Sequence, residues 1–213
     1  MIHIEKGASP ESFENWKRTN YNRKFDALQG KPRSDLINSL ISEQKGLCCY
    51  CCAGIGRENS HIEHIKPKGD RRWKNLRFSY KNLLASCNGY DEYGFTCGHN
   101  KDEWYDEKLF ISPLDEDCES YFTYSLEGRI LGASVDDKKA CETISKLYIN
   151  SYELIAARKA VIDTIMGDSS IHENLETELD WYKTPDDNGQ LEPFYNVIIF
   201  TLEYLLSPEQ LGS

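Results

Sequence analysis

Hydrophobic positions near the N-terminus predict two helices. Residues 36–41 carry Leu, Ile, Leu and Ile with the spacing of one helix face, and Ser34 before them is a typical N-cap. An earlier segment, residues 12–28, is polar with scattered aromatic side chains and is also expected to be helical. The tripeptide 30–32 (Gly-Lys-Pro) is expected to separate these helices, and Gly46 to end the second.

The second half of the chain changes from strand periodicity to helix periodicity. Within residues 120–132, apolar side chains alternate with polar ones around a Glu-Gly turn, which predicts a β-hairpin. From residue 136 to 165 the apolar positions fall near one helix face, and Gly167 is a stop signal. Residues 170–182 are expected to form a further helix, and Pro193 to open the last one.

The 213 residues have the composition of an ordinary globular protein, with 39% hydrophobic and 28% charged positions. The sequence contains no run of about 18 apolar residues and no signal-peptide pattern at its start. We therefore expect a cytoplasmic protein without a membrane span.

The net charge of −10 is unevenly distributed. Residues 1–101 hold 17 Lys and Arg against 11 Asp and Glu, whereas residues 102–213 hold 8 against 24. A basic first half suits a nucleic-acid partner, and an acidic second half is better suited to docking another protein. The alternative is solvated surface charge without a partner.

Eight cysteines indicate a metal site, because disulfides are disfavoured in a reducing compartment. The spacing C-x₂-C occurs twice within residues 47–52, as Cys48/Cys51 and Cys49/Cys52. Cys87 and Cys97 supply a second pair, so four thiolates could enclose a structural zinc ion. We favour Cys48, Cys51, Cys87 and Cys97 and leave the other register open. The alternatives are buried free cysteines or a redox motif.

A histidine segment between the cysteine pairs has the groups needed for hydrolysis. Residues 61–67 read His-Ile-Glu-His-Ile-Lys-Pro. The carboxylate of Glu63 suits a hard cation, and the imidazole of His64 can accept a proton from water. Alone this pattern is weak, since two histidines three residues apart could equally be zinc ligands or surface groups.

Basic residues follow this segment and could contact phosphates. The candidate nucleic-acid contacts are Lys66, Lys68, Arg71, Arg72, Lys74 and, after the last cysteine pair, Lys101. Trp73, Phe78 and Tyr80 lie among them and could stack on unpaired bases. The alternative is a solvated loop whose aromatic side chains belong to the core.

The order of these motifs resembles the zinc-stabilised HNH (ββα-metal) endonucleases. It runs C-x₂-C, Glu-His-Ile-Lys-Pro at 63–67, Asn-Leu-x₃-Cys at 82–87 and Cys-x₃-Lys at 97–101. A wider pattern resembles the PtuB-type HNH proteins of Septu and retron-linked anti-phage systems. It includes residues 43–48, the Cys-Gly-His at 97–99 and the segment 122–130.

The resemblance implies roles for individual residues. His64 is the general base, Glu63 a ligand of a catalytic Mg²⁺ or Mn²⁺, and Asn82 holds the histidine loop by hydrogen bonds. In many relatives an Asn directly follows the last zinc cysteine, whereas this chain has Gly98.

The helix after Cys97 must then supply its metal-binding residue from a later position. The candidates are His99 and Asn100, and we favour His99. His61 is expected to support the cleft.

The expected fold is α+β. N-terminal helices (residues 1–46) precede a zinc-stabilised ββα-metal HNH core (47–110), and a β-hairpin with a mainly helical, partner-binding region follows (111–213).

We predict a metal-dependent endonuclease acting on nucleic acid, with DNA favoured over RNA. The resemblance implies that it is the nuclease subunit of an anti-phage defence complex, with an ABC/SMC-like (PtuA-like) ATPase partner at the acidic half. The alternatives are a non-catalytic zinc adaptor that binds nucleic acid or protein, and a small-molecule metallohydrolase. The latter ranks last because four cysteines leave zinc no open position.

Overall fold

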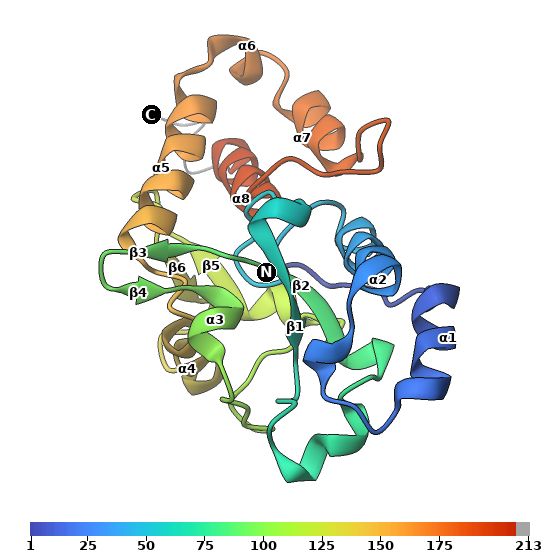
Figure 1. Ribbon diagram of the computed structural model, residues 1–213. Helices are drawn as coiled ribbons and strands as arrows, with labels where there is room; N and C mark the ends of the chain where they lie inside the picture. The colour runs from blue at the N-terminus through green and yellow to red at the C-terminus, as the bar shows by residue number, and fades with distance from the viewer. Residues whose placement is uncertain (208–213) are drawn as a thin grey trace.

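Two helices cover one side of the molecule in the computed structural model, which describes residues 1–207. Helix α1 spans Glu11–Asn20, and α2 spans Gly30–Glu43 and packs against α1 and strand β2 (Leu83–Cys87) (Figure 1). The predicted start of the second helix at Ser34 is wrong, because Gly30 already begins it. Pro32 fits in the first turn, where a backbone N–H has no partner within the helix.

Two antiparallel strands and a short helix form the centre of the molecule. Strand β1 (Ser60–His64) pairs with β2 (Leu83–Cys87), so that Glu63 lies opposite Leu84 and His64 opposite Leu83. The small hairpin of β3 (Tyr90–Asp91) and β4 (Gly94–Phe95) follows, and then helix α3 (Cys97–Lys101). Figure 1 shows α3 beside the two central strands. Single 3₁₀ turns lie at Phe25–Ala27, Arg57–Asn59, Arg71–Leu76, Tyr80–Asn82 and Cys118–Tyr121.

The predicted hairpin within residues 120–132 is confirmed. Strand β5 (Phe122–Tyr124) pairs antiparallel with β6 (Ile130–Gly132). The helical pattern after it is divided into α4 (Lys138–Leu147) and α5 (Tyr152–Gly167) rather than continuous. The division occurs where Tyr148 adopts a left-handed φ of 48° and the Ser151 side chain caps the next helix.

Three helices complete the described chain. The predicted helix over 170–182 is two helices, α6 (Ser169–His172) and α7 (Leu175–Lys183). Helix α8 (Tyr195–Leu206) follows Pro193 as predicted and packs against α5 and α7 (Figure 1). The mixed α+β class is thus confirmed. Within residues 1–207, no helix has the length and hydropathy of a membrane span.

One hydrophobic cluster contains side chains from all three predicted segments, including Phe13, Leu40, Leu84, Ile111 and Leu147. A smaller cluster joins α5, α6 and α8. The buried Arg158 of α5 anchors the β5–β6 turn, since its Nε donates to Gly128 O at 2.6 Å and its Nη2 to Ile149 O at 2.8 Å.

Candidate functional site

Four buried sulfur atoms gather at one end of the central strands. The Sγ atoms of Cys48, Cys51, Cys87 and Cys97 all lie within 4.8 Å of one another. The Sγ atoms of Cys51 and Cys87 are 3.7 Å apart. A tetrahedral zinc ion with bonds of about 2.3 Å separates its sulfur ligands by about 3.8 Å. The predicted set of cysteines therefore comes together with dimensions that could hold zinc.

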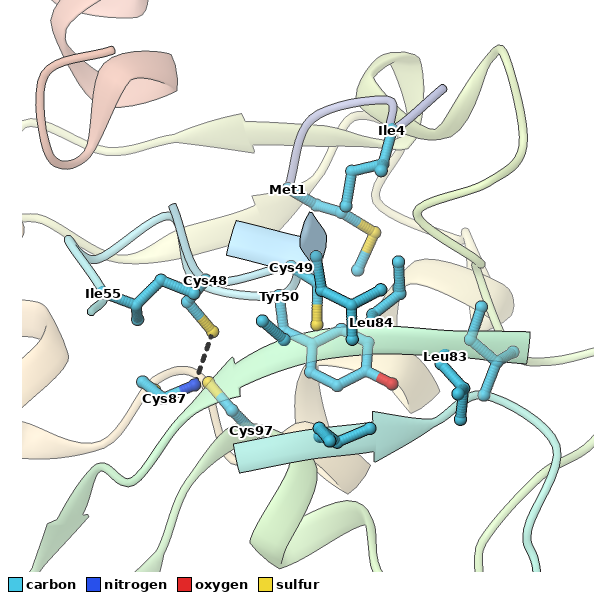
Figure 2. Close-up of a cluster of buried hydrophobic side chains, with 14 of the residues drawn as sticks. Met1, Ile4, Cys48, Cys49, Tyr50, Ile55, Leu83, Leu84, Cys87 and Cys97 are labelled. Carbon is cyan, nitrogen blue, oxygen red and sulfur yellow. Dashed lines mark hydrogen bonds between the residues drawn. The ribbon is translucent and has the colours of Figure 1, made fainter. Parts of the chain in front are cut away.

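The fold distinguishes Cys48 from its neighbour Cys49. The backbone N–H of Cys87 donates to Cys48 Sγ at 3.3 Å, whereas Cys49 Sγ is not one of the four clustered sulfurs (Figure 2). Burial opposes ionisation, yet hydrogen bonds from the neighbouring cysteines bring the pKa of Cys48 well below its usual value. Burial raises the pKa of Cys49 well above it. Cys48 is thus the sulfur prepared to be a thiolate ligand.

Two of the four sulfurs, those of Cys51 and Cys97, need a cation nearby to ionise together with Cys48. Hydrogen bonding to Cys48, together with its charge, raises the pKa of both Cys51 and Cys97. A bound divalent cation would neutralise this shared negative charge, which is the ordinary condition for four thiolates in one site.

The carboxylate of Glu63 is buried and held on one side. Its Oε1 accepts a hydrogen bond from the Tyr50 hydroxyl at 3.0 Å and forms an ion pair with Lys101 Nζ at 2.9 Å. Its Oε2 lies 3.8 Å from His61 Nε2. Burial raises the pKa of Glu63, but His61 and Lys101 outweigh it and lower this pKa below the usual value. The group is therefore a carboxylate whose Oε2 has only the longer contact with His61.

The imidazole of His64 is fixed in orientation and in tautomer. Its Nε2 lies 3.0 Å from the carbonyl oxygen of Arg77, and its ring packs edge-on against Phe25 at 4.5 Å. Because a carbonyl oxygen only accepts hydrogen bonds, Nε2 carries the proton and Nδ1 keeps the lone pair. Burial lowers the pKa of His64 to about 4, so the ring is neutral at pH 7.

The buried side chain of Asn82 ties down the loop that follows β1. Its Oδ1 accepts from Lys66 N at 2.9 Å, and its Nδ2 donates to Lys66 O at 3.0 Å. These bonds correspond to the positioning role that the resemblance implies. Asn82 is not among the residues that line the cleft described below, which suits a positioning role rather than a chemical one.

Helix α3 brings His99, but not Asn100, toward the other site residues. The rings of His99 and His61 lie 3.9 Å apart, and both contact Asn88 Oδ1. Asn100 instead donates to the carbonyl oxygen of Lys146 in α4 at 3.0 Å. Of the two candidates for the third metal-binding residue, His99 alone lies at the site.

An open cleft of about 230 Å³ brings these groups together. It is lined by His61, Ile62, Glu63, His64, Pro67, Lys68, Gly98, His99, Asp102 and Glu103. A cation fits this donor set, because a carboxylate and imidazoles face a small hollow above Gly98. A Cβ atom at that glycine would lie only 2.8 Å from both Glu63 Oε2 and His61 Nε2.

The basic residues predicted to contact nucleic acid differ in how exposed they are and in whether their charge is already paired. Lys68, Arg71 and Lys74 are exposed, and Lys68 borders the cleft. Lys66 lies over the Trp73 ring at 4.1 Å. Arg72, although exposed, is paired with Asp70 by bonds of 2.6 and 2.9 Å.

The structure corrects two expectations about nucleic-acid contacts. Lys101 cannot reach a phosphate on the surface, because its side chain is fully buried against Glu63. Phe78 and Tyr80 are also buried and belong to the core rather than to a stacking surface.

Some residues beside the site were not anticipated. The sequence analysis did not identify Tyr50 and Lys101 as the residues that bind the Glu63 carboxylate. The Cys-x₃-Lys spacing was a signal for the lysine. The β3–β4 hairpin exposes Tyr90, Tyr93 and Phe95, and the Phe95 ring lies 5.2 Å from that of His99. The unusually long interval between Cys87 and Cys97 was the only sequence signal for this hairpin.

Comparison with known proteins confirms the predicted resemblance. No family model matches the chain. It is 28% identical over 176 residues to a candidate HNH endonuclease of retron Vc95 from Vibrio cholerae serotype O1 biovar El Tor, covering 78% of this chain and 84% of that protein. It is 27% identical over 183 residues to a candidate HNH endonuclease of retron Ec83 from Escherichia coli, covering 68% and 70%.

A third relative is the Septu protein PtuB of Bacillus thuringiensis. Identity to it is 24% over 173 residues, which cover 77% of this chain and 60% of PtuB. The chain thus spans less than two thirds of this relative. Together the relatives support an HNH nuclease of the anti-phage type.

Proposed function

We propose that this chain is a metal-dependent HNH endonuclease that hydrolyses phosphodiester bonds of nucleic acid, DNA foremost, within a cytoplasmic anti-phage defence complex. The observation that carries the proposal is the cleft between β1, the loop that follows it, and α3. There the neutral imidazole of His64 and the carboxylate of Glu63 border one hollow beside the four-cysteine cluster. The names of the relatives support the same activity.

His64 is the general base in this proposal. The Arg77 carbonyl holds the proton on Nε2, so Nδ1 accepts the proton of the attacking water. The low pKa keeps the ring unprotonated across the neutral range. Asn82 fixes the loop after His64 through Lys66 and thereby limits movement of the base.

Glu63 presents Oε2 to the cleft while Tyr50 and Lys101 hold Oε1. A bound Mg²⁺ or Mn²⁺ would polarise the phosphate and stabilise the leaving oxygen. The resemblance implies that an imidazole of α3, His99, shares the cation with Glu63. Zinc in the cysteine cluster serves the fold, because four thiolates leave no open position.

The substrate backbone is proposed to follow the exposed basic residues beside the cleft. Lys68, Arg71 and Lys74 would neutralise phosphates and release their counterions. This contribution depends on charge alone and carries no base specificity.

The test is nicking of supercoiled plasmid by the purified zinc-loaded protein, alone and with its partner, in Mg²⁺ or Mn²⁺. His64→Gln is expected to lower the rate by about 10²–10⁴-fold. His172→Gln, which changes a histidine of α6 remote from the cleft, is the matched control and should cleave normally. If the wild-type protein with its partner binds DNA but never nicks it, the zinc adaptor is the correct function.

We further propose that the acidic half docks an ABC/SMC-like ATPase. Its residues Trp181, Asp186 and Asp187 are exposed around a groove of about 450 Å³ after α7. In co-purification with the co-expressed ATPase, the full chain carrying Asp186→Lys and Asp187→Lys should lose the partner. The control Glu11→Lys, on α1, should retain it; equal retention by both would exclude this surface.

A further inference from the structure

Gly98 leaves a space that three other side chains approach. A Cβ atom at this position would meet Glu63 Oε2 and His61 Nε2, both at 2.8 Å, and Ser86 Oγ at 3.0 Å. Real Cβ atoms do not approach polar atoms this closely. The backbone at Gly98 is ordinary helix, so a side chain is opposed here by contact with these groups, which it would displace, rather than by an unusual φ. His61 and Glu63 therefore converge on one point above α3.

Asn88 determines which nitrogen of His61 faces that point. Its Oδ1 lies 2.9 Å from His61 Nδ1. An amide oxygen only accepts, so Nδ1 donates to it and Nε2 faces Glu63 Oε2, 3.8 Å away. In the neutral ring the lone pair of Nε2 is then available to a cation that Glu63 also binds. Metal-binding histidines are typically oriented in this way by a hydrogen bond to their other nitrogen.

His99 is less well placed for the same role. Its Nε2 lies 3.2 Å from Asn88 Oδ1 and so carries a proton. Within residues 1–207, the four cysteines are the only group of three or more potential ligands with all donor atoms within 4.8 Å. His99 thus does not join His61 and Glu63 in a comparably tight set, although its ring stacks beside His61.

We propose that His61, in place of the His99 that the resemblance implies, is the ligand that shares the divalent cation with Glu63. His99 then supports His61, and position 98 is glycine because the two ligands occupy the space above it. The role of this cation in cleavage rests on the proposed nuclease function, but its binding does not. One nitrogen and one carboxylate oxygen, with water completing the shell, favour Mn²⁺ over Mg²⁺.

Direct binding of Mn²⁺ to the zinc-loaded chain tests the ligand assignment. Titration followed by the EPR signal of free Mn²⁺ should show one site in the wild-type protein. His61→Ala should weaken it at least tenfold, and Glu63→Gln should do the same. His99→Ala is the matched control, since it removes the adjacent imidazole, and should change the affinity less than threefold. Zinc content and Tm report whether each variant is folded, and His61→Gln replaces His61→Ala if the latter is not.

A side chain introduced at Gly98 gives an independent test of the ligand assignment. Gly98→Ala in the wild-type background should displace His61 or Glu63 and weaken Mn²⁺ binding at least tenfold. In a His61→Ala background the same change should have a smaller further effect than in the wild-type background, because the added methyl group can then disturb only Glu63 and Ser86. Equal effects in both backgrounds would overturn the steric argument.

The outcomes separate this inference from the proposed function. If the wild-type chain binds Mn²⁺ and His61→Ala binds it equally well while His99→Ala does not, the ligand assignment is wrong and the nuclease proposal stands. If the wild-type chain binds no Mn²⁺ or Mg²⁺ even with its partner and DNA, both the ligand assignment and the metal-dependent mechanism are refuted.

Discussion

The buried ion pair between Lys101 and Glu63 gives the sharpest prediction for stability. Lys101 Nζ lies 2.9 Å from Glu63 Oε1 and donates to the carbonyl oxygen of His64, also at 2.9 Å. The Lys101 side chain is 0% exposed and that of Glu63 is 8% exposed. Lys101→Met preserves most of the side-chain volume but leaves a buried carboxylate whose remaining partners are Tyr50 and His61.

The expected loss of stability follows from two opposing contributions to a buried ion pair, the attraction between the charges and the cost of desolvating both ions. At 2.9 Å, two unit charges attract by about 6 kcal/mol with an effective dielectric constant near 20. Desolvation of both ions offsets much of this attraction, but removing one partner leaves the other buried and uncompensated. Lys101→Met should therefore lower the free energy of unfolding by about 3–5 kcal/mol, a large part of a typical total of about 5–15 kcal/mol.

Urea unfolding of the zinc-loaded protein, arranged as a double-mutant cycle, measures this quantity. The double variant Lys101→Met/Glu63→Gln removes both charges and should be more stable than Lys101→Met alone by about 2 kcal/mol. Lys159→Met is the control, because Lys159 forms an exposed pair with Asp163 and should cost less than about 1 kcal/mol. A loss below about 1 kcal/mol for Lys101→Met, or simple additivity in the cycle, would refute the reasoning.

Three further predictions concern the elements that support the site. Cys51→Ser should lose the bound zinc measured by elemental analysis and unfold, whereas Cys49→Ala should retain one zinc per chain. Asn82→Ala should lower the free energy of unfolding by about 1–3 kcal/mol, because the backbone N–H and C=O of Lys66 lose their partner; an unchanged urea midpoint would contradict this. Arg158→Met should cost about 3 kcal/mol by the same measurement, since it strands the carbonyl oxygens that the guanidinium now binds.

The sequence by itself determined the features that depend on local chemistry and spacing. Paired cysteines at C-x₂-C intervals predict a metal site wherever the chain folds, because the turn aims both sulfurs the same way. Alternating apolar positions around Gly128 predict the β5–β6 hairpin for a similarly local reason. The Asn-Leu-x₃-Cys order pointed to Asn82 as a holding residue through the family resemblance. Helix boundaries were less well determined, as the left-handed turn at Tyr148 shows.

Tertiary structure decided which of several neighbouring residues faces the site. Cys48 and Cys49 are chemically identical in the sequence and both are buried in the core, and only packing places the sulfur of Cys48, and not that of Cys49, among the four clustered sulfurs. Lys101 looked like a surface cation until the fold buried it against Glu63. His61 and His99 come from segments far apart in the chain, and their positions depend on how α3 docks against β1. Such choices are non-local, because adjacent side chains project in different directions and only long-range packing determines which direction is the interior.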